Sequence, residues 1–297
     1  MSESVPRLSI GLAVRNGQGS VERCVESILR QDFMDFEIVI SDNASDDETA
    51  AKIAAYARVD ERIRLSVNQI NIGLHENVNR VLRLSRGTYF RWISADDWLE
   101  QGSLSVCVRA LDNNAGAIGV TTGFTIYSPA GATRHEDFQG EFPTSPDSSR
   151  RFERMLWFYH AGDTKYDPIY GVYRRARLME TRLLRRSERA DWLLCAELAL
   201  RGPIIHLADR LANRTRTSLV GYDRAAFRRR LDPVRSDELK APPGRIYGDL
   251  LDLAISANLA EAQLRRCRMA LRRFWAKEVV RVARSRLADA RYRLLHG

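Results

Sequence analysis

Acidic side chains follow two short apolar runs of the chain. Asp42 comes soon after the run over residues 38–40, and Ser94, Asp96 and Asp97 follow the run over residues 89–93. Both runs have the β-branched and aromatic composition of buried strands, so we expect the polar residues in the loops after them. Ligands of open α/β sheets bind at the carboxyl ends of strands, and carboxylates suit hard divalent cations. The two loops therefore predict a joint site for a sugar nucleotide and a divalent metal ion.

The same residues also have purely structural interpretations. Asp96 and Asp97 precede Trp98 and could cap a helix, where acidic residues are favoured. Asp42 could close a turn after its strand through its own side chain. These few residues alone do not distinguish the structural interpretation from the functional one. The predicted strands and helices around them are therefore needed to distinguish the two.

Strand and helix patterns alternate over the first 93 residues. We predict strands at residues 8–14, 36–40, 63–67 and 89–93, and helices at residues 21–29, 49–59 and 77–84. This alternation is typical of a parallel sheet with right-handed crossovers. Beyond it we expect helices at 104–111, 151–160 and 191–201, strands at 118–127, 169–173 and 204–207, and a loop at 128–149. The predicted fold class is α/β, with a Rossmann-like, mostly parallel sheet flanked by helices and a C-terminal helical extension.

The formal charge of +9 is divided unevenly along the 297 residues. Residues 1–150 hold 15 Lys and Arg against 21 Asp and Glu, whereas residues 151–297 hold 32 against 17. An acidic front half suits metal binding, and a basic back half suits a diphosphate, a membrane surface or nucleic acid. No recognised nucleic-acid-binding motif accompanies the charge, so we expect no nucleic-acid partner.

Apolar runs, the N-terminal residues and the cysteine spacing indicate the cellular compartment of the protein. The sequence has no run of about 20 apolar residues that could span a bilayer. Residues 1–6 lack the basic and apolar regions of a secretion signal. The four cysteines are far apart and form no CxxC pair, which favours buried thiols in a reducing compartment: Cys24, Cys107, Cys195 and Cys267. We therefore expect a cytoplasmic protein.

An ordered series of short motifs resembles the family 2 glycosyltransferases, which have the GT-A fold. The series spans roughly residues 7–216, and its members follow the family's order and spacing. It comprises residues 9–16 (SIGLAVRN), 25–31 (VESILRQ), 35–40 (DFEIVI), 42–45 (DNAS), 71–73 (NIG), 85–89 (SRGTY), 94–97 (SADD) and 191–202. Each member alone is weak, but the ordered set is specific.

This resemblance implies inverting transfer of a sugar from a nucleoside diphosphate to an acceptor hydroxyl. Asp42 matches the carboxylate that contacts the base, and Ala13, Val14 and Arg15 would line the same pocket. Asn79 could contribute a hydrogen bond near the nucleotide. The donor is expected to be a UDP-sugar, and the acceptor a glycan or a lipid-linked sugar.

The resemblance also assigns the metal ligand and the general base. Asp96 matches the aspartate that holds Mg²⁺ or Mn²⁺ on the diphosphate, and we place Asp97 beside it as a further metal contact. Ser94 stands where the family often has a carboxylate that contacts the ribose. Asp191 matches the general base, with Glu188 as its rival.

Three departures from the family pattern accompany these assignments. The usual Asp-x-Asp is Ser94-Ala95-Asp96, and the usual Pro-x-Tyr-Asn is residues 13–16 (AVRN). The family usually has a glutamate directly before the base, but this chain has Ala190 there. The loss of this like charge should leave the pKa of Asp191 lower. A late arginine, Arg214 or Arg216, could reach the diphosphate.

We expect three segments in the chain. Residues 1–217 form the GT-A catalytic domain, residues 218–244 a linker, and residues 245–297 a basic amphipathic helical tail. The tail could bind a membrane surface peripherally, or pack on the catalytic domain or on a partner in a homodimer. Two other functions stay open: a nucleotidyltransferase, which would release pyrophosphate, and a non-catalytic relative that binds sugar nucleotides or partners.

Overall fold

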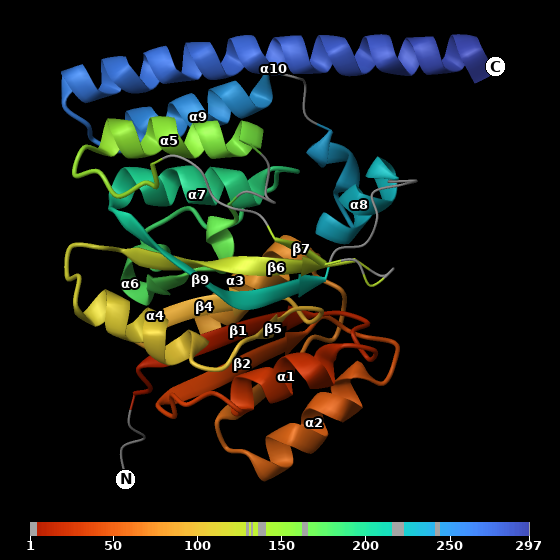
Figure 1. The fold of residues 1–297 in the computed structure, drawn as a ribbon. Helices are drawn as coiled ribbons and strands as arrows, with labels where there is room; N and C mark the ends of the chain where they lie inside the picture. The colour runs from red at the N-terminus through yellow and green to blue at the C-terminus, as the bar shows by residue number, and fades with distance from the viewer. Residues whose placement is uncertain are drawn as a thin grey trace.

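The structure is a computed structural model that describes residues 5–128, 131, 133–135, 141–161, 166–215, 223–240 and 244–296. Over these residues one sheet lies between two layers of helices, and a long C-terminal helix forms the outer edge of one layer (Figure 1). The predicted α/β class is confirmed.

The first part of the chain alternates strands and helices as the sequence predicts. Its elements are β1 (Leu8–Val14), α1 (Val21–Leu29), β2 (Phe36–Asp42), α2 (Thr49–Val59), β3 (Ile63–Val67), α3 (Leu74–Leu84) and β4 (Tyr89–Ile93). The bounds of β1, α1, α2, β3 and β4 agree with the prediction. Helix α3 begins earlier than predicted, because Gly73 adopts a φ of 85° and turns the chain directly into it.

The second part departs further from the predicted pattern. Its elements are β5 (Trp98–Leu99), α4 (Ser103–Asp112), β6 (Gly119–Tyr127), β7 (Thr133–His135), α5 (Ser148–Ala161), η1 (Pro168–Tyr170), β8 (Val172–Arg174), α6 (Arg175–Met179), α7 (Ala190–Arg201) and β9 (Ile204–Thr215). Strand β7 lies in the predicted loop because it pairs with β6. Strand β9 continues past the predicted end because its second half pairs with both β6 and β5.

The nine-stranded sheet has the order β3-β2-β1-β4-β8-β6-β9-β5, with β7 paired to β6. Strands β3, β2, β1 and β4 are parallel, whereas β8, β5 and β7 pair antiparallel with their neighbours. The register pairs Val14 with Asp42 and Leu12 with Ile93. The loops after β1, β2 and β4 therefore leave the sheet at one edge, as the sequence requires for a joint site.

Each face of the sheet carries its own apolar core. Along β4, Phe90 and Trp92 pack toward α3, α5 and α7, whereas Tyr89 and Ile93 pack toward α1 and α4. This alternation is the side-chain period of two expected of a strand that is buried on both faces. All four cysteines are buried free thiols, as predicted.

The chain after residue 222 packs onto the body. It forms α8 (Arg224–Leu231), η2 (Ser236–Leu239), α9 (Arg245–Ser256) and α10 (Glu261–His296). Over residues 223–240 the predicted linker holds α8 and η2, and burial of Leu231 and Leu239 fixes these helices against the body. Leu250, Leu271 and Phe274 join the core of α5 and α7, so α9 and α10 pack on the body of the fold. Among the described helices, none has a hydrophobic stretch of the length needed to span a bilayer.

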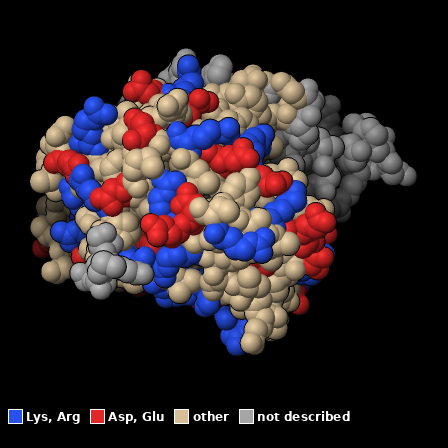
Figure 2. All heavy atoms as spheres, turned by 90° about the horizontal axis from the view of Figure 1, so that it is seen from below, with Lys and Arg blue, Asp and Glu red and all other residues tan. Residues whose placement is uncertain are grey.

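Charges of both signs are interleaved on the face shown in Figure 2. On helices α1 and α2, Lys52 pairs with Glu22 at 2.6 Å and Arg30 with Glu26 at 3.3 Å. The described part of this face therefore lacks the one-sign basic patch that is typical of nucleic-acid binding.

Candidate active site

Two adjoining pockets open beside the carboxyl ends of β1, β2 and β4. The Asp191 pocket has a volume of about 230 Å³, and its polar lining comprises His75, Ser94, Asp167, Tyr170, Glu188, Asp191 and Arg214. The asparagine pocket has a volume of about 280 Å³ and is lined by Ala13, Val14, Arg15, Asn16, Asn43, Asn71, Leu74, Asn77 and Arg230. Both pockets include Ala13 and Leu74, so they adjoin at these residues, and together they are called the cleft below.

Asp191 lies in the first turn of α7 and reaches the solvent of its pocket. Asp191 is exposed to the solvent of its pocket, yet the protein packed around the pocket limits the hydration of its carboxylate. This desolvation, followed by the charge of Asp167, raises the pKa of Asp191 to about 6. These effects outweigh the hydrogen bond from the Trp192 backbone and the positive charge of Arg189, so the pKa of Asp191 lies above its ordinary value even without an acidic neighbour at residue 190. A carboxylate with a pKa near 6 is well placed to accept a proton near neutral pH.

Glu188, the rival base, is held by two guanidinium groups. Arg224 Nη2 donates to Glu188 Oε2 and Arg228 Nη1 to Glu188 Oε1, both at 3.1 Å. In contrast, Asp191 has no ion-pair partner within the described part of the chain. Asp191 is therefore the better candidate for accepting a proton.

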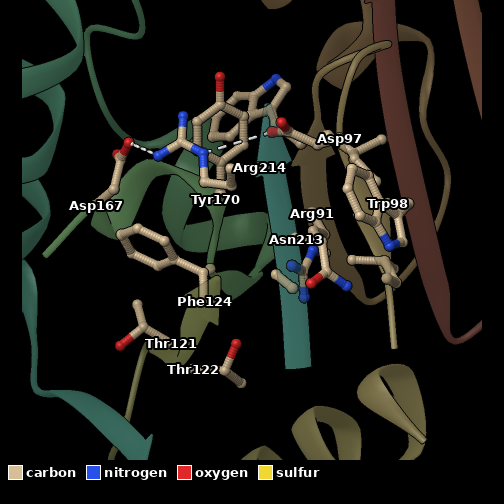
Figure 3. Close-up of a pocket in the computed structure, with 15 residues that line it drawn as sticks. Arg91, Asp97, Trp98, Thr121, Thr122, Phe124, Asp167, Tyr170, Asn213 and Arg214 are labelled. Atoms are coloured by element: carbon tan, nitrogen blue, oxygen red, sulfur yellow. Dashed lines mark hydrogen bonds and ion pairs between the residues drawn. The ribbon is translucent and has the colours of Figure 1, made fainter. Parts of the chain in front are cut away.

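Arg214 lies between two carboxylates at the C-terminal end of β9 (Figure 3). It forms an ion pair with Asp167 on one side, and its Nε lies 3.5 Å from Asp97 Oδ2 on the other. Burial lowers the pKa of Arg214, but the charges of Asp167 and Asp97 outweigh burial and raise it. Arg214 is thus paired with two protein carboxylates, which argues against the expected contact with the diphosphate. Arg216 lies outside the described residues.

Asp97 is directed into this buried cluster. Its Oδ1 accepts a hydrogen bond from the Thr215 backbone at 3.2 Å. Burial raises its pKa to about 7, and the neighbouring charge of Asp96 adds to that rise. A buried carboxylate that is paired with Arg214 is poorly suited to hold a metal ion. We therefore drop Asp97 from the metal ligands.

Asp96 is exposed and lines neither pocket itself, but it adjoins the cleft through Ser94. Ser94, which lines the Asp191 pocket, donates its hydroxyl to the Asp96 carboxylate. The loop is fixed by the Asp96 carbonyl, which accepts from Arg23 Nη2 and Thr215 Oγ1, both at 2.9 Å. No three His, Cys, Asp or Glu side chains converge as a metal cluster in the ranges that the structure describes. One exposed carboxylate still fits Mg²⁺ or Mn²⁺, which keep several waters and bind substrate phosphates.

Asp42 lies at the end of β2 with its side chain fully buried. Its carboxylate accepts hydrogen bonds from the Ser45 hydroxyl and, at 3.0 Å, from the Ser45 backbone. This is the turn-closing interpretation of the sequence. The next residue, Asn43, lines the asparagine pocket, and its Oδ1 accepts from the Ile72 backbone at 2.9 Å. A base contact by Asp42 would require its turn to open.

Of the other residues predicted to contact the sugar nucleotide, some line the cleft and one lies in the core. Ala13, Val14 and Arg15 all line the asparagine pocket. Asn79 does not: its amide donates to the Leu184 carbonyl at 2.9 Å and accepts from the Leu184 backbone N–H at 3.0 Å. Both ends of the Asn79 amide are thus occupied in a structural contact, and we drop this residue from the donor contacts.

Sequence reasoning missed Asp167 and the residues of α8 in this cleft. Asp167 precedes η1 and meets Arg214 only through the tertiary fold, 47 residues away along the chain. No local pattern marks such a pair. The apolar residues Phe227 and Leu231 of α8 carried a usable signal, because their helical spacing contradicts a linker.

A family model described as Glycosyl transferase family 2 matches residues 9–187. The chain belongs to glycosyltransferase family 2. The matched region holds β1 to β4 and the loop with Asp96, and it ends before Asp191. The role of Asp191 in this family 2 chain is therefore argued from the pocket itself.

Curated relatives match about a third of this family 2 chain. The GalNAc(5)-diNAcBac-PP-undecaprenol beta-1,3-glucosyltransferase of Campylobacter jejuni is 33% identical over 106 residues, covering 35% of this chain and 34% of that protein. Chondroitin synthase of Escherichia coli is 34% identical over 104 residues, covering 35% of this chain and 15% of that protein. The chain spans about a third of the length of the first curated relatives that it matches.

Solved structures confirm the predicted GT-A fold of this family 2 chain. S. aureus TarS 1–349 in complex with UDP-GlcNAc gives a TM-score of 0.66 at 17% identity, covering 91% of this chain and 73% of TarS. The mannosyltransferase PcManGT of Pyrobaculum calidifontis, in complex with GDP-Man and Mn2+, gives a TM-score of 0.51 at 17% identity, covering 97% of this chain and 81% of that protein.

Proposed function

We propose that this chain is a metal-dependent inverting glycosyltransferase with Asp191 as general base. The single observation that carries the proposal is the placement of Asp191: it shares a pocket with Ser94, whose hydroxyl bonds Asp96, and it has a raised pKa. A base and a candidate metal carboxylate thus lie at one cleft of a family 2 fold.

The proposed reaction moves one proton to Asp191. The acceptor hydroxyl donates its proton to the carboxylate while its oxygen bonds to the anomeric carbon of the sugar. The bond between that carbon and the diphosphate oxygen breaks, and its electron pair leaves with the nucleoside diphosphate. Asp167 and Glu188 stay paired with their arginines and keep the pocket walls in place.

The leaving diphosphate needs charge stabilisation. A Mg²⁺ or Mn²⁺ ion held by Asp96 would supply it by neutralising the charge that develops on the phosphates. Ser94 orients the Asp96 carboxylate through its hydroxyl. This hydroxyl carries no charge of its own, so the metal affinity of the protein rests mainly on Asp96 and the bound phosphates.

The donor and acceptor are also proposals. A UDP-sugar donor is supported by the likeness to TarS bound to UDP-GlcNAc, although PcManGT holds GDP-Man. A glycan or lipid-linked acceptor is supported by the names of the relatives. A cytoplasmic location, peripheral membrane contact through the tail, and a homodimer stay predictions.

A donor screen tests this proposal. We would measure thermal shifts with UDP-, GDP- and dTDP-sugars in the presence of Mn²⁺, and then identify the product released by the stabilising donor. Transfer with release of a nucleoside diphosphate supports a glycosyltransferase. Release of pyrophosphate would indicate a nucleotidyltransferase, and stabilisation without turnover on any acceptor would indicate a binding protein.

A further inference from the structure

Helix α8 forms part of the wall of both pockets. Its residues Phe227 and Leu231 line the Asp191 pocket, and Arg230 lines the asparagine pocket. This helix lies beyond residue 187, where the family match ends. Neither the family match nor the predicted linker gives it a role in the site.

Contacts on two sides fix α8 against the cleft. Arg224 and Arg228 hold Glu188, three residues before Asp191 in the chain. At the other end, a Cβ at Gly73 would lie only 2.5 Å from the Leu231 carbonyl oxygen, so this glycine permits the close approach of α8 to the loop before α3. The position of α8 is therefore set by the same segments that carry the site.

Arg230 differs from the other arginines of this helix. Arg224 and Arg228 pair with Glu188, and Arg229 lies 3.6 Å from Asp223. Arg230 is exposed and has no ion pair within the part of the chain that the structure describes. Its guanidinium keeps its hydrogen-bond donors available to a ligand of the pocket.

Two positively charged side chains, Arg15 and Arg230, and no acidic residue line the asparagine pocket. Arg15, which extends from the end of β1, is partly engaged by Asp46 at 3.3 Å and the Asn43 carbonyl at 3.4 Å. The pocket amides bond one another: Asn43 Nδ2 donates to Asn71 Oδ1 at 2.8 Å. Of the two charged residues that line this pocket, Arg230 thus has more hydrogen-bond donors available to a ligand.

We propose that Arg230 binds a phosphate of the nucleoside-diphosphate donor, which makes α8 part of the donor site. This inference rests on the proposed function. A guanidinium offers a planar fork of donors that matches phosphate oxygens, and such charge-assisted bonds are stronger than neutral ones. The alternative partner is a carbonyl oxygen of the nucleobase. It carries no charge, so its hydrogen bond from Arg230 would be weaker than a charge-assisted bond to phosphate.

The experiment compares ligands with and without phosphates on matched variants. By calorimetry we would measure binding of UDP and of uridine, or GDP and guanosine if the donor screen selects them, with Mn²⁺ present. Arg230→Ala should weaken diphosphate binding roughly 10- to 100-fold, and leave nucleoside binding unchanged. Arg230→Lys should restore part of the affinity because it keeps the charge. The adjacent, exposed Arg229→Ala is the control and should bind like the wild type.

Three results would overturn the assignment, and they are distinguishable. Equal diphosphate affinity of Arg230→Ala and wild type would show that Arg230 makes no contact, while the proposed function stands. Equal losses for nucleoside and diphosphate would assign Arg230 to the base instead of a phosphate. Failure of the wild type to bind any nucleoside diphosphate would remove the proposed function, and this inference with it.

Discussion

Asp167 and Asp191 line one pocket, and the negative charge of Asp167 adds to burial in raising the pKa of Asp191 to about 6. Arg214 pairs with Asp167 and so holds it beside η1. The proton affinity of the proposed base is therefore set partly by a residue from another element. This relationship gives the proposed mechanism a measurable pH dependence.

The first prediction concerns the base itself. Asp191→Asn should lower the turnover number for sugar transfer by roughly 10²- to 10⁴-fold, because the amide cannot accept the proton. Donor binding should persist, since the amide nearly matches the carboxylate in shape. Steady-state transfer and calorimetric binding of the donor check both parts. Should Glu188→Gln abolish turnover while Asp191→Asn keeps it, Glu188 would be the base.

The second prediction is the acid limb of the pH profile. Asp191 must be ionised to act, so kcat/KM should rise as pH increases through about 6, the raised pKa of this carboxyl. Asp167→Asn removes a neighbouring negative charge and releases the positive charge of Arg214, and both changes favour ionised Asp191. The limb should therefore move to lower pH. A limb that does not move in Asp167→Asn would contradict the electrostatic link.

Local sequence patterns were sufficient to predict the strands that carry the site. The apolar runs of β1, β2 and β4 and the polar residues after them predicted one shared edge, and the register of Val14 with Asp42 confirms it. Pairs that meet only in the tertiary fold left no such pattern. Arg214 meets Asp167 and Asp97 because β9 pairs with β5. No local sequence pattern predicts this pairing of strands.

Local sequence patterns also could not predict which way each side chain points. Asp96 and Asp97 are adjacent and chemically identical, yet one is exposed and the other is buried against Arg214. Asp42 is likewise turned to Ser45, whereas the neighbouring Asn43 lines the pocket. The sequence predicted which loops meet at the cleft, but it did not predict which member of each acidic or polar pair faces it.

The third prediction separates the two aspartates by metal dependence. Chelation with EDTA should abolish transfer, and Mn²⁺ or Mg²⁺ should restore it in the wild type. Asp96→Ala should lose on the order of 10²-fold or more in metal-stimulated transfer, because the ion would stabilise the leaving diphosphate. Asp97→Asn is the matched control: it should unfold more easily but keep its metal dependence. Loss of metal stimulation in Asp97→Asn alone would reverse our assignment.

The fourth prediction concerns the packing of the tail. Leu271 of α10 is fully buried in the core that α5 and α7 share. Leu271→Ala should therefore lower the free energy of unfolding by about 2–5 kcal/mol, through lost burial and the cavity left behind. Arg272→Ala, at the next and exposed position, should change it by no more than about 0.5 kcal/mol. Urea unfolding followed by circular dichroism measures both. If Leu271→Ala were as stable as the wild type, α10 would not be part of the catalytic core, and attachment to a membrane or a second chain would become the better account of the tail.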